Sequence, residues 1–323
     1  MDGARIVELA SARSSTVRLM EGSAGWWRRG LNGLDVGAWS TDTLPLIRYS
    51  GAGTCLTVHD LRFLYGTRYL TLKRFLLLKL MMVPAIRRAD AIVTVSRWSA
   101  GEMARRYDIP SSRLHVVPNA VDPLMRESAT GAASPYGADY ILAVGHLESR
   151  KNLPVLLEAF AGLRPDECRL LVLAGADLGM GERLRRQSEE LGIADRVVIA
   201  GAVPEAELPR LYSNSRILIC PSLYEGFGMT LLEGMSMGIP VIASAIPPHL
   251  EIGSDVPRWV EAGDGMAERL REEISLVLED RELAVDMGGR GLSRAAEFNW
   301  ERSAQLMGDV YSGLLRERGK PER

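Results

Sequence analysis

Cysteine is scarce in this chain, and its three residues, Cys55, Cys168 and Cys220, lie far apart without a CxxC spacing. This scarcity excludes a disulfide scaffold and a zinc ribbon, and it favours a reducing compartment such as the cytoplasm. The longest apolar stretch, residues 75–83, is interrupted by Lys79 and is much too short to span a bilayer. The amino terminus lacks a basic stretch followed by an apolar run, so it does not read as a secretory signal.

Lysine and aromatic residues are also rare. Four lysines stand against 35 arginines, so a lysine at a motif position is more informative than usual. Aromatic residues make up 6% of the chain and no recognition motif is present, which argues against nucleic acid as a partner. Nothing indicates a bound metal or a resident cofactor, because the four histidines are dispersed without ligand spacing: His59, His115, His146 and His249.

Apolar residues, in contrast, are abundant: 46% of the 323 residues are hydrophobic and 25% are charged. Such a chain can bury a core, and its length predicts about two domains. The net charge of −2 conceals an asymmetry, because residues 1–137 hold 18 Lys/Arg and 11 Asp/Glu, and the remainder holds 21 and 30. The basic first part suggests an anionic partner, although composition alone favours solvated surface charge.

Short continuous apolar runs predict strands buried on both faces, in the second half at 140–145, 170–175, 196–201, 216–222 and 240–244. Segments of helical periodicity separate them, so we expect right-handed βαβ units and a parallel sheet. A weaker version of the pattern predicts strands at 54–59, 91–96 and 114–118 and helices at 71–88 and 97–107. Pro84 should kink or end the first of these helices early. Residues 1–50 are poorly patterned, and 128–138 have the composition of a linker.

The first informative motif is VGHLESRKN at 144–152, which leaves a predicted strand and enters a helix at about Leu153. Arg150 and Lys151 then lie outside the carboxyl end of a parallel strand, where open α/β sheets bind ligands. Two adjacent cations suit a diphosphate. Cations at a helix amino terminus oppose the helix dipole, so this placement calls for a compensating anion.

The second motif is PSLYEGFGMTLLEG at 221–234, which follows another predicted strand and enters a helix near Met229. Its glycines allow the backbone to approach a ligand closely, and the helix start offers free N–H groups. Glu225 and Glu233, eight residues apart, can border one crevice. Carboxylates accept hydrogen bonds from vicinal hydroxyls, so a sugar or a ribose is the natural partner.

Together these motifs resemble those of the retaining, nucleotide-sugar-dependent glycosyltransferases of the GT-B fold, specifically glycosyltransferase family 4. Glu225 and Glu233 match the E-x7-E pattern of that family, and Gly145 through Asn152 match its G-x-L-x-x-R-K-N pattern. The likeness extends from His59 to the end, through stretches similar to the family's HDL, R-A-D-x-I-V-T-V-S and V-V-P-N-G-V-D runs, at 59–61, 88–96 and 116–122.

The resemblance implies an α/β fold with two facing Rossmann-like domains and a deep cleft. Residues 1–137 would form the acceptor-side domain, residues 138–300 would bind the nucleotide sugar, and residues 301–323 would cross back to the first domain. Arg150 and Lys151 would hold the donor diphosphate, Glu233 the ribose and Glu225 the transferred sugar. His59 would contact that sugar near its anomeric centre. The remaining donor-binding positions would be His146, Gly226, Phe227, Gly228, Met229 and Thr230.

Two departures from the family pattern bear on activity. His146 stands where many members have an arginine, which weakens part of the diphosphate clamp or makes it pH-dependent. Only 58 residues precede His59, and the usual strand and glycine-rich loop are not visible there. Either the chain is shortened at its start or the first domain lacks part of its sheet. Ala120, in place of the usual glycine, is a structural detail.

The basic segment 68–88 allows two interpretations. It carries Arg68, Lys73, Arg74, Lys79, Arg87 and Arg88 and no acid, around an apolar run. It could lie on an anionic bilayer as an amphipathic helix, which would place the protein peripherally on the inner face of the cell membrane. Alternatively, it could pack on the sheet and expose a basic rim. This second interpretation is favoured because most apolar stripes on helices face a core.

The predicted function is transfer of a hexose, with retention, from a nucleotide diphosphate sugar to a glycan or lipid-linked acceptor in cell-surface polysaccharide or glycolipid synthesis. The first domain favours the mannosyltransferase-like branch and GDP-mannose, with a UDP-hexose close behind. Two alternatives stay open: a nucleotide-sugar-binding protein without turnover, and, more distantly, a nucleotide-sugar epimerase.

Overall fold

The computed structural model describes residues 36–39, 53–122, 125, 133–137 and 139–317. The chain divides into two compact units, Met1–Pro118 with Glu301–Arg323, and Asn119–Trp300. The boundary therefore precedes the expected one at residue 137. Val117 still packs in the core of the first unit, whereas the ring of Tyr136 already contacts Tyr140 of the second, with centroids 6.2 Å apart. Most of the predicted linker at 128–138 lies outside the described residues.

The first unit contains a parallel four-stranded sheet in the order β1-β2-β3-β4. Its strands are β1 (Val36–Trp39), β2 (Gly53–Val58), β3 (Ala91–Thr94) and β4 (Leu114–Val116). Strand β1 lies within the stretch that the sequence left without structure, so that expectation was wrong for these four residues. The rest of residues 1–50 lies outside the described part of the chain.

Helices cover both faces of this sheet. On one face, Leu56, Val58 and Ile92 pack against α3 (Leu72–Arg88) and α4 (Arg97–Tyr107). On the other, Cys55, Ala91 and Val93 pack against α13 (Trp300–Glu317), so the last helix belongs to the first unit. Short 3-10 turns complete the unit at Arg62–Arg68 (η1) and Ser111–Arg113 (η2).

Helix α3 continues through Pro84 to Arg88, so of the two expected effects, a kink or an early end, the early end was wrong. Proline removes the N–H that would pair with the carbonyl of Leu80. Leu80 lies on the exposed side of the helix, where water can replace that hydrogen bond. Arg113 donates to the carbonyls of Ile86 and Arg87, which helps to hold the helix end in place.

Two sequence motifs of the first unit have structural roles. Asp90 accepts hydrogen bonds from the backbone N–H and the hydroxyl of Thr54, at 2.9 and 2.8 Å, and so ties the start of β2 to the start of β3. Ser96 caps α4 by accepting a hydrogen bond from the N–H of Ser99. These residues account for the R-A-D and T-V-S parts of the sequence without any ligand.

The second unit contains a parallel six-stranded sheet in the order β10-β9-β8-β5-β6-β7. The strands are β5 (Tyr140–Val144), β6 (Leu170–Ala174), β7 (Val197–Gly201), β8 (Ile217–Cys220), β9 (Val241–Ser244) and β10 (Arg258–Val260). All five strands predicted in this half are confirmed; β10 was not predicted. The chain extends the sheet in one direction from β5 and in the other from β8, so the strand order reverses between these two neighbours.

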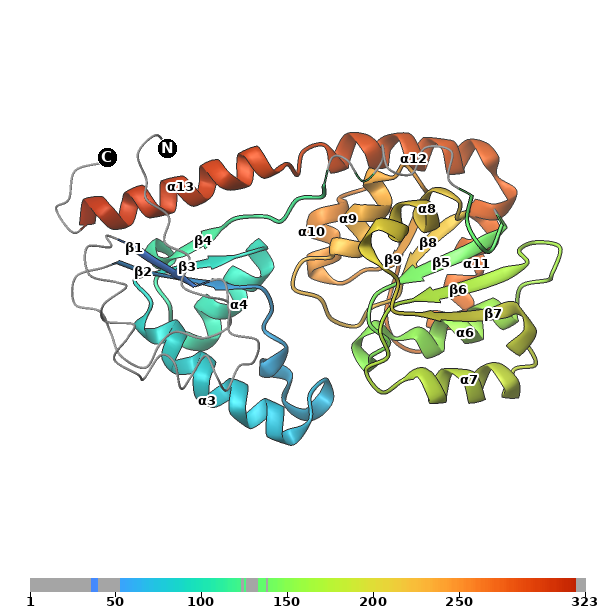
Figure 1. Ribbon diagram of the computed structural model, residues 1–323, viewed down its shortest axis with the longest axis horizontal. Coiled ribbons are helices and arrows are strands. Elements are labelled where there is room, and N and C mark those ends of the chain that lie inside the picture. The colour runs from blue at the N-terminus through green and yellow to red at the C-terminus, as the bar shows by residue number, and fades with distance from the viewer. Residues whose placement is uncertain (1–35, 40–52, 123–124, 126–132, 138, 318–323) are drawn as a thin grey trace. The chain divides into compact units, whose positions relative to one another are not determined.

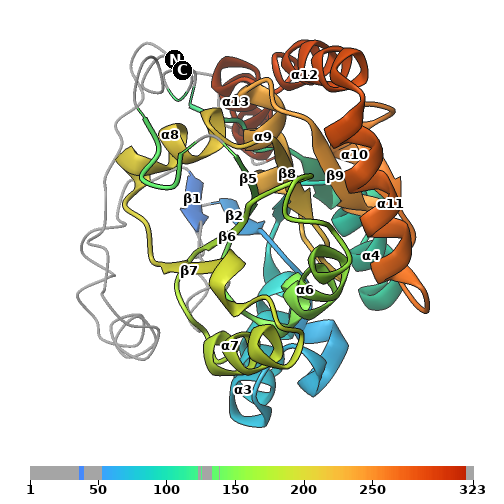
Figure 2. The ribbon, with the colours of Figure 1, turned by 90° about the vertical axis from the view of Figure 1, so that its right-hand side faces the viewer.

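Helices α6 and α7 lie on one face of this sheet and α8 and α9 on the other (Figures 1 and 2). Alternate residues of the strands face the two layers: Ile141 and Ile219 join the core with α6 and α11, whereas Leu218 packs beneath α9. The helices are α6 (Leu153–Ala161), α7 (Gly181–Glu190), α8 (Leu208–Ser213), α9 (Met229–Ser236), α10 (Pro247–Gly253), α11 (Met266–Glu279) and α12 (Arg281–Ala295); 3-10 turns span Ser149–Lys151 (η3), Ala194–Arg196 (η4) and Glu205–Glu207 (η5).

Candidate functional site

A pocket opens at the carboxyl ends of β5 and β8, where the strand order of the second unit reverses. Neighbouring strands there send their chains to opposite faces of the sheet, which leaves room for a ligand between the two outgoing loops. Both motifs singled out from the sequence leave these two strands. The pocket is lined by Ala143, Val144, Gly145, Lys151, Leu153, Ile219, Cys220, Pro221, Ser222, Glu225, Gly228, Thr230 and His249.

Gly145 and Lys151 are fitted to each other. Gly145 has a φ of 132°, a conformation that favours glycine, and a Cβ at this position would lie 2.8 Å from Cε of Lys151. The aliphatic part of the lysine therefore lies against the bare Cα of the glycine. Because of this packing, the Lys151 side chain is only 13% exposed, and its ammonium is held at the pocket.

Two other residues shape the loop between them. Leu147 is buried, and its N–H and C=O bond to the backbone of the strand β6 loop, at Ala176 and Leu178. Asn152 adopts the left-handed conformation with a φ of 53°, and α6 begins directly after it. The glycine, leucine, lysine and asparagine of the first motif thus each have a physical role in the shape of this loop.

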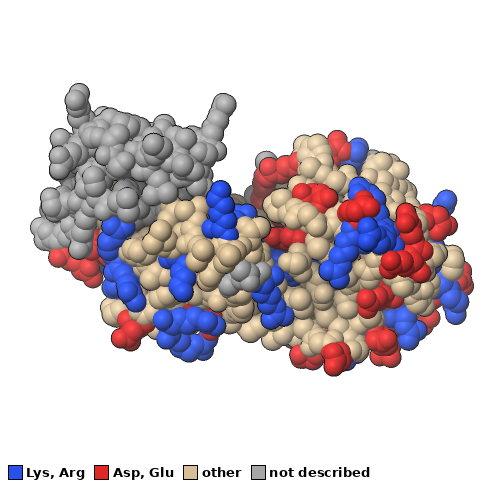
Figure 3. All heavy atoms as spheres, turned by 90° about the horizontal axis from the view of Figure 1, so that it is seen from below, with Lys and Arg blue, Asp and Glu red and all other residues tan. Residues whose placement is uncertain are grey.

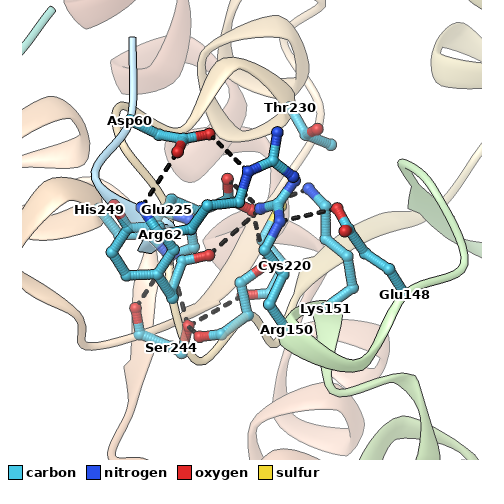
Figure 4. A network of polar contacts seen from close by, with 12 residues as sticks. Asp60, Arg62, Glu148, Arg150, Lys151, Cys220, Glu225, Thr230, Ser244 and His249 are labelled. Atoms are coloured by element: carbon cyan, nitrogen blue, oxygen red, sulfur yellow. Dashed lines mark hydrogen bonds and ion pairs between the residues drawn. The ribbon is translucent and has the colours of Figure 1, made fainter. Parts of the chain in front are cut away.

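Glu225 lies at the centre of a network of polar contacts (Figure 4). Its Oε1 accepts from Nζ of Lys151 at 2.8 Å and from Oγ of Ser222 at 2.9 Å, and its Oε2 accepts from Nη1 of Arg150 at 2.5 Å. Nε of Arg150 also forms an ion pair with Glu148 at 2.7 Å. Two carboxylates and two cations are therefore held together at the start of α6.

The charges in this network compensate one another. Burial by itself would raise the pKa of Glu225, but the charges of Lys151 and Arg150 outweigh burial and lower the pKa to about 2. The carboxylate is thus ionised across the physiological range. It also supplies the anion that two cations at a helix start require.

His249 is a pocket residue that the sequence did not single out. It lies on α10, is 2% exposed, and its Nδ1 lies 3.1 Å from the carbonyl oxygen of Ser244. A carbonyl only accepts, so Nδ1 carries the proton. Burial lowers the pKa of His249 to about 4, despite the opposing charge of Glu225. The imidazole is therefore neutral at pH 7, with Nε2 as an acceptor.

The signal for His249 was present in the sequence. The strand that became β9 ends in Ser244, and a helix start with a histidine follows five residues later. The same argument from strand ends that selected Arg150 and Glu225 applies here, because β9 is the neighbour of β8. Ser222 and Ser244, which form hydrogen bonds within the same network, also follow strand ends or close them and were likewise not singled out from the sequence.

Glu233 lies beside the pocket rather than among its lining residues. It is on α9, and one of its oxygens accepts from the hydroxyl of Tyr212 at 2.6 Å. Burial raises the pKa of Glu233, whereas the Tyr212 hydrogen bond and the charge of Lys151 lower it less strongly. The charge of Lys151 thus lowers the pKa of both Glu225 and Glu233, although only Glu225 lines this pocket.

The loop between them divides into two parts. Gly228 and Thr230 line the pocket, whereas Gly226, Phe227 and Met229 are not among its lining residues. Phe227 is buried and packs edge-on against Phe298, with ring centroids 6.0 Å apart. Gly228 has a φ of 109° and lies against the ring of His249, so a side chain there would meet the histidine.

The two remaining predicted residues, His59 and His146, are both exposed. His59 follows β2 in the first unit, and the adjacent Asp60 accepts from the backbone N–H of Arg62 at 3.1 Å. His146 follows β5 and is not among the residues that line the pocket. In the described part of the chain, no group of three or more His, Cys, Asp or Glu is arranged to hold a metal ion. Among the described helices, none combines the length and apolarity needed to cross a bilayer.

Comparison with known proteins identifies both halves of the chain. Residues 127–294 match the family Glycosyl transferases group 1, and residues 35–123 match Glycosyltransferase Family 4. The O-antigen chain mannosyltransferase B of Escherichia coli is 30% identical over 80% of this chain and 70% of its own length. Across the first three curated relatives, the chain spans between 54% and 70% of their length.

Solved structures agree with this assignment. Sucrose-phosphate synthase from Thermosynechococcus elongatus is 25% identical, with a TM-score of 0.69 over 83% of this chain and 69% of that one. HepE from Anabaena, in complex with UDP and glucose, has a TM-score of 0.68 at 18% identity, over 81% of this chain and 72% of that one. The predicted GT-B fold class is confirmed, since the chain contains two parallel-sheet α/β units and is structurally similar to solved glycosyltransferases. The chain belongs to the group 1 glycosyl transferases.

Proposed function

We propose that the protein transfers a hexose, with retention of anomeric configuration, from a nucleotide diphosphate sugar to a glycan or lipid-linked acceptor. The observation that supports this most is the Arg150–Lys151–Glu225 network at the point where the strand order of the second unit reverses. It brings two cations for a diphosphate together with a carboxylate for sugar hydroxyls; Lys151 and Glu225 line the pocket, and Arg150 contacts Glu225.

In the proposed reaction, an acceptor hydroxyl forms a bond to the anomeric carbon on the face from which the diphosphate departs. The bond from the anomeric carbon to the diphosphate oxygen breaks, and the leaving diphosphate takes the proton of the acceptor. Arg150 and Lys151 would stabilise the charge that develops on the diphosphate, which is the main source of rate enhancement in such a scheme.

The contacts of Lys151 support this role. Lys151 has three N–H donors and is held at the pocket, so it can bind a phosphate oxygen while it still donates to Glu225. Glu225 would accept from the hydroxyls of the transferred sugar, and Glu233 from those of the ribose. We propose that Gly228 and Thr230 offer backbone contacts, and that His59 and His146 contact the donor as the family resemblance implies.

A mannose donor is the first choice. The E. coli relative is an O-antigen chain mannosyltransferase, and mannosyltransferases recur among the other relatives. We therefore propose GDP-mannose as the donor, a UDP-hexose as the next candidate, and an acceptor in cell-surface polysaccharide or glycolipid synthesis. A lipid-linked acceptor would place the reaction at the inner face of the cell membrane.

The test is release of nucleotide from a panel of GDP- and UDP-sugars in the presence of glycan and lipid-linked acceptors. Transfer should occur with one donor class, and the product should keep the anomeric configuration of the donor by NMR. Lys151→Ala should reduce transfer by about 100-fold, because it removes a cation from the leaving group. Donor binding without release for every donor would contradict the assignment of turnover.

A further inference from the structure

Helix α3 exposes apolar side chains that the core of the first unit does not use. Four of its leucines have exposed fractions between 42% and 75%: Leu72, Leu76, Leu77 and Leu80. They recur at spacings of one, three and four residues, which places them on one side of the helix. The opposite side is buried, since Met82, Ala85 and Ile86 join the core against the sheet.

The helix does pack on the sheet, as the favoured interpretation expected, but its exposed side is more than a basic rim. When a helix is apolar on both sides, its own core covers only one of them, and another partner covers the second. Singly exposed leucines are ordinary on protein surfaces, whereas four together on one helix mark a contact surface.

Cations surround these leucines. Lys73, Arg74, Lys79 and Arg87 are exposed, and no acidic residue occurs between Asp60 and Asp90. Within the described residues, Lys73, Arg74 and Lys79 form no ion pair with a carboxylate; the ammonium of Lys79 lies 5.7 Å from the ring centroid of Phe75. Figure 3, viewed from the side on which α3 lies in Figure 1, shows mainly basic and uncharged residues on the described surface of this unit.

The combination of apolar and basic residues selects the partner. A nucleic acid would satisfy the cations and leave the leucines exposed to water. A bilayer with anionic headgroups satisfies both, because the leucines enter the boundary between headgroups and acyl chains while the cations meet the phosphates. We propose that the exposed side of α3 docks on an anionic lipid surface.

The helix is ready for such docking before it meets a membrane. Thr71 caps its first turn, and Arg113 donates to carbonyls of its last turn. Its buried side is held by the core, so binding does not require a segment to fold. The inference does not depend on the proposed transfer reaction, although a lipid-linked acceptor would make this orientation useful.

The experiment is flotation of the full chain with vesicles of phosphatidylcholine alone and with vesicles that also contain phosphatidylglycerol. The protein should float with the anionic vesicles, and added salt should weaken binding because the attraction is screened. The double variant Leu76→Gln/Leu80→Gln should reduce the bound fraction by about tenfold or more, and Lys73→Gln/Lys79→Gln should do the same at low salt.

The matched control is Leu178→Gln/Leu276→Gln, which removes two exposed leucines of the second unit and should leave binding unchanged. Each variant is compared with wild type for thermal unfolding and for nucleotide release. A second measurement maps the surface directly: a polarity-sensitive dye on Leu80→Cys should shift to the blue with anionic vesicles, and on Leu178→Cys it should not. The three native cysteines are buried, so labelling is selective.

Three outcomes would overturn the proposal. Wild type does not float with anionic vesicles, or the α3 variants float as well as wild type. Alternatively, the leucine variants dissociate an oligomer in sedimentation without changing flotation, in which case a second copy covers the helix. If wild type does not float but still releases nucleotide, the docking surface alone is rejected, whereas wild-type flotation without transfer would reject the proposed reaction alone.

Discussion

The two sheets are both parallel, yet only one of them reverses its strand order within the described residues. In the second unit the reversal between β5 and β8 opens a pocket, and four charged side chains meet beside it. In the first unit the described strands run β1-β2-β3-β4 without a reversal. Its chemical features are at the surface instead, as an exposed histidine after β2 and an apolar, basic helix side.

This difference shows what topology contributes to a site. A reversal separates the loops of two adjacent strands, so side chains from distant parts of the sequence converge between them. Without a reversal in the described strands of the first unit, its histidine and its basic helix side remain exposed. The comparison predicts that substitutions at the pocket strongly reduce stability and transfer, whereas substitutions on the exposed side of α3 have little effect on stability.

The largest effect is expected for Glu225→Ala. The side chain is 12% exposed and pairs with Arg150 and Lys151, so its removal leaves two poorly solvated cations with only Glu148, the other partner of Arg150, to compensate them. We expect a loss of roughly 3–5 kcal/mol in the free energy of unfolding and an about 100-fold loss of transfer. Urea unfolding and donor turnover measure the two. Glu182→Ala, at a side chain that is 79% exposed, should change stability by less than about 0.5 kcal/mol.

The next effect is a pH dependence that His249 introduces. Burial lowers its pKa from 6.5 in the unfolded chain to about 4, so the unfolded chain binds a proton in this window that the folded chain does not. Stability is complete above pH 6.5 and falls as the pH drops towards 4, by about 3 kcal/mol. Glu225, whose pKa is lowered from 4.5 to about 2, adds a loss of stability that begins near pH 4.5 and lies mainly below this window.

Urea unfolding between pH 7 and pH 4 measures this slope, and His249→Asn should flatten it. The asparagine amide can still donate to the carbonyl of Ser244, so the variant removes the titration and keeps the hydrogen bond. An equal slope in wild type and variant would show that other groups cause the pH dependence. In that case the buried pocket would not add a pH dependence of stability that the exposed side of α3 lacks.

A smaller effect is expected for Gly145→Ala. The φ of 132° and the contact with Lys151 both oppose a Cβ, so the variant should lose about 2 kcal/mol of stability and displace the lysine. Transfer activity should fall further than the loss of stability alone would cause, because Lys151 is displaced. Gly289→Ala is the matched control, because this exposed helical glycine has nothing within 4 Å of a new Cβ. It should stabilise the protein by about 0.5–1 kcal/mol.

The smallest effect is expected on the exposed side of α3. Leu80→Ala should change the free energy of unfolding by less than about 0.5 kcal/mol, since the side chain is 75% exposed. On the same helix, Ile86→Ala should cost about 2–4 kcal/mol because Ile86 is fully buried. Thermal or urea unfolding of the two variants tests the difference. Similar losses would mean that the leucine side of the helix is packed.

Much of the second unit was predictable, because a strand buried on both faces is a continuous apolar run and its neighbours are helical. The starts of α6 at Leu153 and α9 at Met229 followed from the two motifs. In the first unit, β1 was missed because the four residues VGAW do not form a longer apolar run. The continuation of α3 through Pro84 depends on which side of the helix faces water, and local sequence does not contain that information.

The sequence by itself determined the α/β class, the family and the residues that could carry a reaction, because motif spacing and apolar periodicity are local properties. The tertiary structure decided which of those residues meet. It paired Glu225 with Arg150 and Lys151, brought His249 to the same pocket with its Nδ1 against the carbonyl of Ser244, and withdrew Phe227 into the packing against Phe298. It also left the leucines of α3 uncovered. These outcomes depend on the order of strands and on burial, which arise only when distant segments pack together.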